Sequence, residues 1–206
     1  LCARPEVDAD RIGCAGHSLG GTITQNVVSV DERVRLALPA AWVTHFDSIV
    51  GSLSCEWRPP GLKFHADMPD QLGAGAPHCA TLVQYGALDK VHDTLRHERL
   101  HETVRLVRRL YELFGVADRF DLEMVPEAGH RPFFINRRAF GWVERWLGMP
   151  KLDADAVAAL PEVLIGDWAE RYGVTIDPTY AEMLHYAGTL AIDLDGTAWA
   201  WGRNLH

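Results

Sequence analysis

The feature that most constrains the fold is the pentapeptide G-H-S-L-G at residues 16–20, which places a serine between two glycines. A short apolar run precedes it at residues 11–15, and a segment that can be helical follows it at residues 22–28. This order predicts a buried strand, a sharp turn with Ser18 at its tip, and a helix. A glycine-rich turn with an incidental serine is the alternative interpretation.

The glycines around Ser18 are each expected to have a steric role. A side chain at Gly16 or Gly20 would clash in so sharp a turn, and Gly21 is expected to let the helix approach the sheet closely. The N–H of Leu19 lies at the expected start of the helix, where a developing negative charge would be stabilised. The sequence therefore predicts that Ser18 is a nucleophile and that the Leu19 N–H forms part of an oxyanion hole beside it.

The rest of residues 1–149 alternates between strand and helix patterns. This alternation predicts an α/β fold with a mostly parallel sheet and helices on both faces. Expected strands are residues 34–41, 80–85 and 120–125, and expected helices are 94–114 and 132–147. Residues 42–78 are expected to mix loops with short helices. The first of the long helices should bury one apolar stripe, made of Leu100, Val104, Val107 and Tyr111.

Residues 150–206 differ from the preceding chain, and a boundary is expected near Pro150. Two helices are expected in this C-terminal extension, at residues 153–172 and 178–187. A β-hairpin should follow, because residues 190–194 and 197–201 flank an Asp-Gly pair that is typical of a two-residue turn. The predicted organisation is therefore a core at residues 1–149 and an extension with a hairpin.

A serine needs a base and an orienting acid before it can act as a nucleophile. Asp89 follows the expected strand at 80–85, and His130 follows the one at 120–125. Loops after parallel strands meet at one edge of the sheet, which predicts that both side chains lie near Ser18. Asp93 is the rival acid, although it is better placed to cap the long helix. The predicted catalytic residues are Ser18, Asp89 and His130.

These motifs resemble those of the α/β-hydrolase superfamily over residues 4–148. The likeness is closer to bacterial acetyl xylan esterase-like and dienelactone hydrolase-like proteins. The segments that carry it are residues 4–13, Gly16 to Gly21, residues 66–70 with 76–77, and Glu127 to His130. The resemblance implies a serine esterase that works through an acyl-enzyme, with a Ser-His-Asp triad and the N–H of Leu19 in the oxyanion hole.

The N-terminal strands that normally precede this turn are not recognisable in the sequence. Only about fifteen residues come before the turn that starts at Gly16, so just the C-terminal part of the fold is expected. The loop that supplies a second oxyanion N–H precedes the serine in such folds. Because losing one such donor costs on the order of a hundredfold in rate, weak or no activity is expected from these 206 residues alone.

Composition argues against several other partners. The net charge of −8 is unsuited to nucleic acid, and no apolar stretch approaches the ~20 residues of a membrane span. The four cysteines show neither zinc-ligand nor disulfide spacing. A serine esterase requires no metal or organic cofactor, so none is expected. The expected partner is a small-molecule or carbohydrate ester. Oligomeric state and compartment stay open, although a cytoplasmic location is favoured. Candidate substrate-binding residues are His17, Trp42, Phe46 and Trp57.

Several competing interpretations have weaker support from the sequence. Residues 97–101 match the zinc motif H-E-x-x-H, but an ordinary solvated helix face is the preferred interpretation. Residues 193–197 match a phosphatase D-x-D-G-T motif, but only nine residues follow it. Peptidase or thioesterase chemistry of the same fold, and a non-catalytic binding module, stay open as alternatives.

Overall fold

The computed structural model describes most of the N-terminal core and short parts of the extension. The described residues are 2–3, 5, 7–45, 64–89, 94–134, 136–151, 153, 155–156, 170–171, 173, 175, 189–192 and 198–201. The chain divides into two compact units, Leu1–Lys151 and Leu152–His206. No described helix is long and apolar enough to cross a membrane.

The first unit is built on a four-stranded parallel sheet whose spatial order β1-β2-β3-β4 is the order along the chain. Its strands are β1 (Ile12–His17), β2 (Val34–Ala40), β3 (Ala80–Gly86) and β4 (Phe120–Val125). The helices are α1 (Leu19–Val30), α2 (Met68–Gly73), α3 (Thr94–Leu113) and α4 (Arg137–Leu147), with a 3-10 turn η3 at Ala117–Arg119. The expected α/β class and parallel sheet are confirmed.

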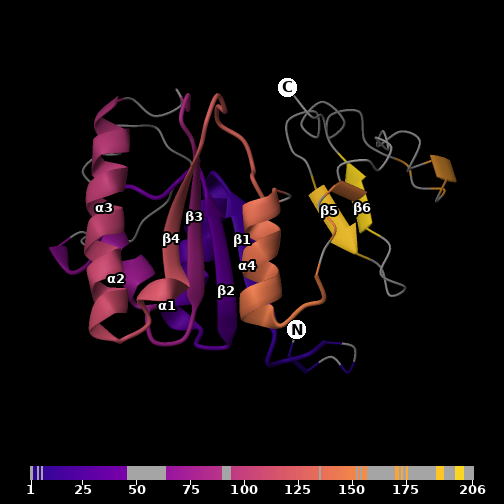
Figure 1. Ribbon diagram of the computed structural model, residues 1–206, viewed down its shortest axis with the longest axis horizontal. Helices are drawn as coiled ribbons and strands as arrows, with labels where there is room; N and C mark the ends of the chain where they lie inside the picture. Colours follow the sequence, from indigo (N-terminus) through magenta and orange to yellow (C-terminus); the bar gives the residue numbers. More distant parts are fainter. Residues whose placement is uncertain are drawn as a thin grey trace. The chain divides into compact units, whose positions relative to one another are not determined.

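Helices cover both faces of this sheet, with α1, α2 and α3 on one face and α4 on the other (Figure 1). Because side chains alternate along a strand, each strand supplies apolar residues to both layers. Val83 and Tyr85 pack with α2 and α3, whereas Leu82 packs with α4. All four strands run in the same direction, so their carboxyl ends share one edge of the sheet.

The long helix α3 buries the stripe expected from its sequence. Leu100, Val104, Val107 and Tyr111 are all buried, and they join one core cluster with residues from α2 and β3. The Tyr111 hydroxyl donates to the Cys79 carbonyl at 3.0 Å, so this aromatic residue is buried without losing its hydrogen bond. The helix is therefore fixed to the sheet by apolar packing along its length.

The last helix of the first unit starts later than expected. The sequence predicts helix from residue 132, but α4 begins at Arg137. Asn136 is its N-cap, and the Oδ1 atom accepts a hydrogen bond from the Ala139 N–H at 2.8 Å. The connection between β4 and α4 is therefore longer than the sequence predicts, and this loop carries His130.

The second unit contains the expected strand pair. Strands β5 (Thr189–Ile192) and β6 (Ala198–Trp201) are antiparallel, with Ile192 opposite Ala198. The pairing is confirmed for these residues, whereas residues 193–197, including the Asp-Gly pair, lie outside the described residues. Most of the helices expected at 153–172 and 178–187 also lie outside them.

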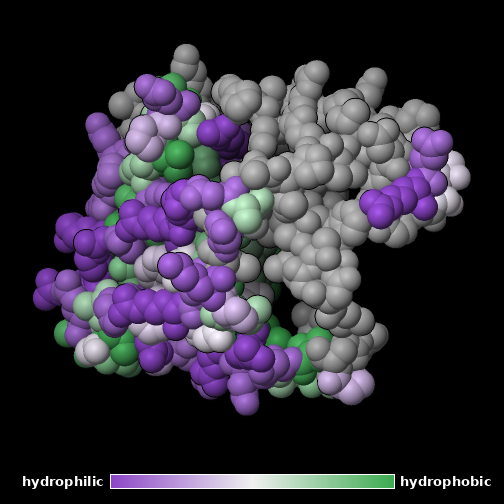
Figure 2. All heavy atoms as spheres, turned by 45° about the vertical axis from the view of Figure 1, so that its right-hand side comes forward, coloured by the Kyte–Doolittle hydropathy of each residue, from purple (hydrophilic) through white to green (hydrophobic). Residues whose placement is uncertain are grey.

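Figure 2 shows that the surface formed by the described residues, on the side drawn, is mainly hydrophilic.

Candidate active site

Ser18 lies at the tip of the expected turn between β1 and α1. Its backbone has φ 55° and ψ −117°, a conformation that residues with a side chain rarely adopt. Hydrogen bonds on both sides hold it there: the Ser18 N–H donates to the Ala40 carbonyl at 2.9 Å, and the Ser18 carbonyl accepts from the Gly21 N–H at 2.8 Å. Such strain persists where the surrounding structure enforces it, and it is concentrated at functional sites.

The glycines of the turn differ in how strictly they are required. A Cβ at Gly16 would lie 2.0 Å from the Gly20 carbonyl oxygen, and one at Gly21 would lie 2.8 Å from the Ala40 carbonyl oxygen. These two positions therefore need glycine, as expected. The steric reason predicted for Gly20 is wrong, because a Cβ there meets no atom within 4 Å among the described residues. The crowding comes from the Gly20 backbone, against which Gly16 packs.

Asp89 and His130 are joined directly. The Nδ1 atom of His130 lies 2.8 Å from the Asp89 Oδ2, with the carboxylate side chain fully buried and the imidazole 19% exposed. Asp89 follows β3 and His130 follows β4, at the carboxyl edge of the sheet. The Asp89 carboxylate can only accept, so Nδ1 carries a proton, and in the neutral imidazole this leaves the lone pair on Nε2.

The two loops that carry this pair also touch through their backbones. The Leu88 N–H donates to the Ala128 carbonyl at 2.8 Å. Contact this close requires a glycine at the end of β3, since a Cβ at Gly86 would lie 2.2 Å from the Gly129 carbonyl oxygen. The sequence marks Gly86 only as the end of a strand. Its packing role cannot be recognised without knowing that residues 86 and 129 meet.

His17 connects the serine turn to the acid–base pair. Its ring lies against that of His130, with centroids 4.6 Å apart and the planes tilted by 56°. The pKa of His17 is lowered to about 4, mainly by burial and also by the nearby His130, whereas Asp89 opposes the shift. The structure therefore brings Asp89 and His130 into direct contact, and it places His17, the residue before Ser18, against His130. Contact of the Ser18 hydroxyl with His130 stays a prediction.

Other sequence-based candidates are placed differently. Trp42 is buried, and its Cβ would lie 3.3 Å from a Cβ added at Gly21. Phe46, Trp57 and Asp93 lie outside the described residues. Their substrate-binding and capping roles stay predictions.

The H-E-x-x-H segment differs in part from its expected solvated face. His97 is half-buried and packs edge-on against Tyr85, with ring centroids 5.8 Å apart, whereas Glu98 and His101 are exposed. Among the described residues, no group of three or more side chains could hold a metal ion.

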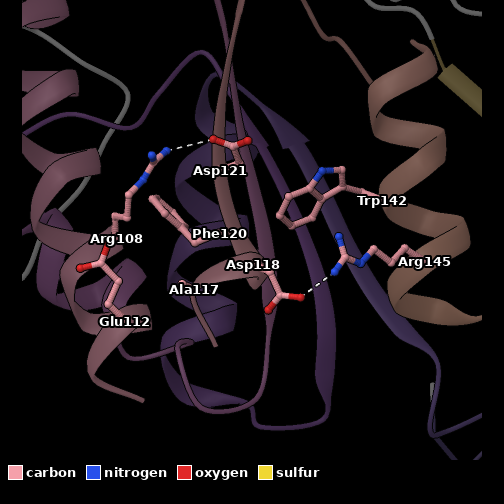
Figure 3. A pocket seen from close by; sticks show the side chains of 8 residues that line it. All are labelled: Arg108, Glu112, Ala117, Asp118, Phe120, Asp121, Trp142 and Arg145. Atoms are coloured by element: carbon pink, nitrogen blue, oxygen red, sulfur yellow. Dashed lines mark hydrogen bonds and ion pairs between the residues drawn. The ribbon is translucent and has the colours of Figure 1, made fainter. Parts of the chain in front are cut away.

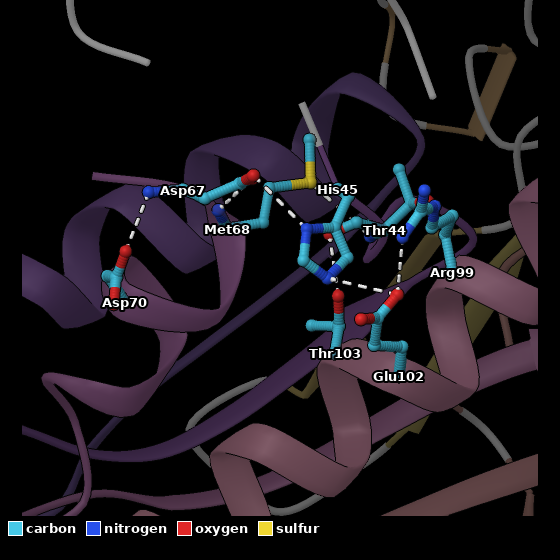
Figure 4. Close-up of polar contacts among 8 residues, drawn as sticks. All are labelled: Thr44, His45, Asp67, Met68, Asp70, Arg99, Glu102 and Thr103. Carbon is cyan, nitrogen blue, oxygen red and sulfur yellow. Dashed lines mark hydrogen bonds and ion pairs between the residues drawn. The ribbon is translucent and has the colours of Figure 1, made fainter. Parts of the chain in front are cut away.

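A second histidine–carboxylate contact fastens the loop after β2 (Figure 4). The Nδ1 atom of His45 lies 3.1 Å from the Asp67 Oδ2, and the Thr103 hydroxyl donates to the Thr44 carbonyl at 3.0 Å. The other oxygen of Asp67 accepts from the N–H of Met68, the first residue of α2. These bonds tie the loop to α2 and α3, so we interpret the cluster as structural.

A surface hollow of about 450 Å³ opens between α3, β4 and α4 (Figure 3). Its charged residues include two ion pairs, Arg108 with Asp121 and Arg145 with Asp118. The lining residues are Arg108, Glu112, Ala117, Asp118, Phe120, Asp121, Trp142 and Arg145. The hollow lies at the amino end of β4, whereas Ser18, Asp89 and His130 lie at the carboxyl edge, so it is separate from the candidate site.

No family model and no curated protein matches the chain. Among solved structures, it is similar to a carbohydrate esterase family 15 glucuronoyl esterase from Caldicellulosiruptor kristjansonii, with a TM-score of 0.52 and 20% identity over 62% of this chain and 40% of that one. It is also similar to methylesterase BT1017, with a TM-score of 0.55 and 20% identity over 78% and 36%. For a glucuronoyl esterase catalytic domain from Hypocrea jecorina, the TM-score is 0.53 and the identity 16% over 70% and 47%.

The chain spans less than half the length of each of these three structures. Their low identity to the chain makes the likeness one of fold. It agrees with the parallel sheet flanked by helices and with the serine turn between its first strand and helix. The chain therefore carries part of the α/β-hydrolase fold.

Proposed function

We propose that this chain carries the catalytic residues of a serine hydrolase that cleaves carboxylic esters. Ser18 is the nucleophile, His130 the general base and Asp89 the residue that orients the base. The observation that carries the proposal is the 2.8 Å contact between His130 Nδ1 and the buried Asp89 carboxylate. The strained backbone of Ser18 and the contact of its neighbour His17 with His130 support it. A base oriented by an acid is what a serine hydroxyl needs for attack.

In the proposed reaction, the Ser18 Oγ attacks the ester carbonyl carbon as its proton passes to His130 Nε2. The tetrahedral intermediate collapses, its bond to the leaving oxygen breaks, and His130 returns the proton to the departing alcohol. Water then adds to the acyl-enzyme by the same route and releases the acid. Asp89 stays ionised throughout and stabilises the imidazolium that forms twice in each cycle.

The oxyanion would form at the amino end of α1. The Leu19 N–H is the first of the helix and therefore has no acceptor within it. A hydrogen-bond donor at this position stabilises the developing negative charge, and the helix dipole adds to the effect. We therefore assign Leu19 to the oxyanion hole through its backbone, and not through its side chain.

An ester of a carbohydrate is the substrate class that we favour. The named solved structures include glucuronoyl esterases and a methylesterase, which supports ester chemistry for a chain of this fold. An acetyl xylan esterase-like preference agrees with the sequence resemblance. The ring of His17 lies against that of the base, so contact with the bound ester is proposed for it.

Covalent labelling by a fluorophosphonate tests the nucleophile directly. Such a probe phosphonylates an activated serine, so the wild type should label while Ser18→Ala should not. Ser29 lies in the same helix, and its hydroxyl donates to the Asn26 carbonyl at 2.7 Å, so Ser29→Ala is the matched control. Labelling that persists in Ser18→Ala would contradict the proposal, and so would a wild type that does not label at all. The latter result would favour a non-catalytic binding module.

Substrate panels distinguish the remaining alternatives of the same fold. A p-nitrophenyl acetate assay, an acetylated xylan assay, a thioester assay and a peptide assay would be run in parallel. We expect turnover of the oxygen esters, weak for these 206 residues alone because one oxyanion donor is expected to be missing, and lost in Ser18→Ala. Turnover of the thioester or the peptide alone would replace the ester assignment with a thioesterase or peptidase.

A further inference from the structure

α4 covers one face of the sheet, and two polar side chains, Gln84 and Glu123, interrupt the apolar residues on that face. Leu82 packs in the apolar cluster under α4, and two residues further along β3 the same face presents Gln84. Gln84 is fully buried, and its partner in register on β4 is Glu123. A buried amide and a carboxylate at this place need a reason, because burying polar groups costs free energy unless each is hydrogen-bonded.

Both N–H donors of the Gln84 amide are used. Its Nε2 donates to the Glu123 Oε2 at 2.7 Å and to the Phe133 carbonyl at 3.1 Å. Both partners can only accept, so the nitrogen must face them, and the Oε1 atom is left buried without a partner among the described residues. The amide is therefore held in one orientation, at some cost, with its donors pointing to β4 and to the loop that follows it.

Glu123 receives further donors from the far end of that loop. The Nδ2 atom of Asn136 donates to both Glu123 oxygens, at 3.0 and 3.1 Å. The Oδ1 atom of Asn136 already caps α4 through the Ala139 N–H, which fixes the amide so that its nitrogen faces the carboxylate. Glu123 thus links β3, β4 and the first residue before α4.

The loop held in this way is the one that carries His130. At its start, the Ala128 carbonyl accepts from the Leu88 N–H. Beyond His130, the bonds from Gln84 to Phe133 and from Asn136 to Glu123 anchor the loop to the sheet. We propose that Glu123 is a positioning residue, which through Gln84 and Asn136 holds the His130 loop so that the imidazole meets Asp89.

This inference rests on the proposed role of His130 as the base. The hydrogen bonds of Glu123 go to Gln84 and Asn136, so its effect on His130 passes through the loop. Removing the charge with Glu123→Gln places an N–H2 group against the Asn136 N–H2 donor in either orientation of the new amide, and against the Gln84 donor as well in one of them. At least one bond must then be lost, and we expect the loop beyond His130 to loosen while the sheet stays paired.

The experiment compares Glu123→Gln with Asp121→Asn. Asp121 lies two residues earlier on the same strand, and its ion pairs with Arg108 and Arg138 do not involve the His130 loop. Two readouts are used: the rate of fluorophosphonate labelling, and the low-field proton resonance of the His130 Nδ1–H, identified by its absence in His130→Gln. Melting curves establish that each variant is folded.

We expect Glu123→Gln to slow labelling by about tenfold or more and to broaden or abolish the low-field resonance, as loss of orientation predicts. Asp121→Asn should change the rate by less than about twofold and keep the resonance. Asn136→Ser retains a capping oxygen for α4 but cannot donate to Glu123 in the same way. It should show the same loss to a smaller extent, and it replaces Glu123→Gln if that variant does not fold.

Two results would overturn the inference: a Glu123→Gln protein that keeps both the rate and the resonance, or an Asp121→Asn protein that loses them equally. If the wild type labels no faster than Ser18→Ala, the proposed function fails, and the resonance alone decides the role of Glu123. Its loss in Glu123→Gln supports positioning, and its retention rejects it.

Discussion

The imidazole rings of His17 and His130 lie against each other, with centroids 4.6 Å apart, so the residue before the candidate nucleophile contacts the candidate base. One ring is half-buried at the end of β1, and the other comes from the loop after β4. Because burial keeps His17 neutral, it presents an uncharged aromatic surface to a ring that becomes cationic during the proposed reaction. This contact has consequences for stability as well as for the reaction.

We predict that His17 makes the fold less stable in acid. Its pKa is 6.5 for the free side chain and about 4 in the folded protein, so between these values the unfolded state binds a proton that the folded state does not. Lowering the pH from 6.5 to about 4 therefore favours unfolding through this residue. His17→Phe should reduce the pH dependence in that window. Urea unfolding at about pH 7 and about pH 5 measures the difference.

The control for that experiment is His101→Gln, since His101 is exposed on α3. It should leave the pH dependence of unfolding close to that of the wild type. If the free energy of unfolding changed equally with pH in His17→Phe and in the wild type, the low pKa assigned to the His17 ring would be contradicted.

The buried Asp89 carboxylate gives a second prediction. Asp89→Asn can keep the contact with His130, but its amide carries no charge, and when its N–H2 group donates to Nδ1 the wrong tautomer of the imidazole is favoured. The expected loss in kcat is on the order of 10⁴-fold. Ester hydrolysis measured under saturating substrate gives this value. Glu127→Gln, an exposed carboxylate change in the His130 loop, should stay within about twofold of wild type, as surface changes usually have little effect.

Much of this arrangement can be predicted from sequence because the signals are local. A glycine–serine turn after an apolar strand, and polar residues directly after two later strands, indicate Ser18, Asp89 and His130. All three lie in loops after parallel strands, where the direction of the chain alone places them at one edge. The contact between Asp89 and His130 follows from that topology.

The residues that the sequence does not indicate depend on contacts between distant segments. Glu123 has the pattern of an ordinary polar position in an alternating strand, and only pairing with Gln84 and Asn136 gives it a role. The late start of α4 has the same origin. The segment from 132 has helical periodicity, but the bond from Gln84 to the Phe133 carbonyl holds the chain in a loop until Asn136 caps the helix.

The two glycines that flank Ser18 should respond differently to alanine. The Cβ of Gly16→Ala would overlap the Gly20 carbonyl oxygen, which the helix start cannot move aside easily. Its cost should exceed the about 1–3 kcal/mol typical of overpacking. Gly20→Ala meets open space in the first turn of α1 and should change stability by less than about 1 kcal/mol. Chemical unfolding of both variants decides this, and equal destabilisation would contradict the difference in space around the two positions.

Gly86 provides the sharpest test of how the acid and base loops depend on each other. A Cβ there would lie 2.2 Å from the Gly129 carbonyl oxygen and 2.3 Å from that of Ala128, both backbone atoms that cannot rotate away. Gly86→Ala must therefore push the His130 loop off the end of β3. We expect a loss of stability of at least about 1–3 kcal/mol, together with a larger loss of kcat than of substrate affinity.

The matched control for Gly86→Ala is Gly141→Ala on the exposed side of α4, where an added Cβ meets no described atom. Alanine at an exposed helical position is favoured over glycine by up to about 1 kcal/mol, so this variant should be as stable as the wild type or more so. If Gly86→Ala retained wild-type kcat and stability, the loops would not be packed as closely as their backbone bonds imply. The direct contact between Asp89 and His130 would then need another explanation, because it depends on those two loops meeting at the end of β3.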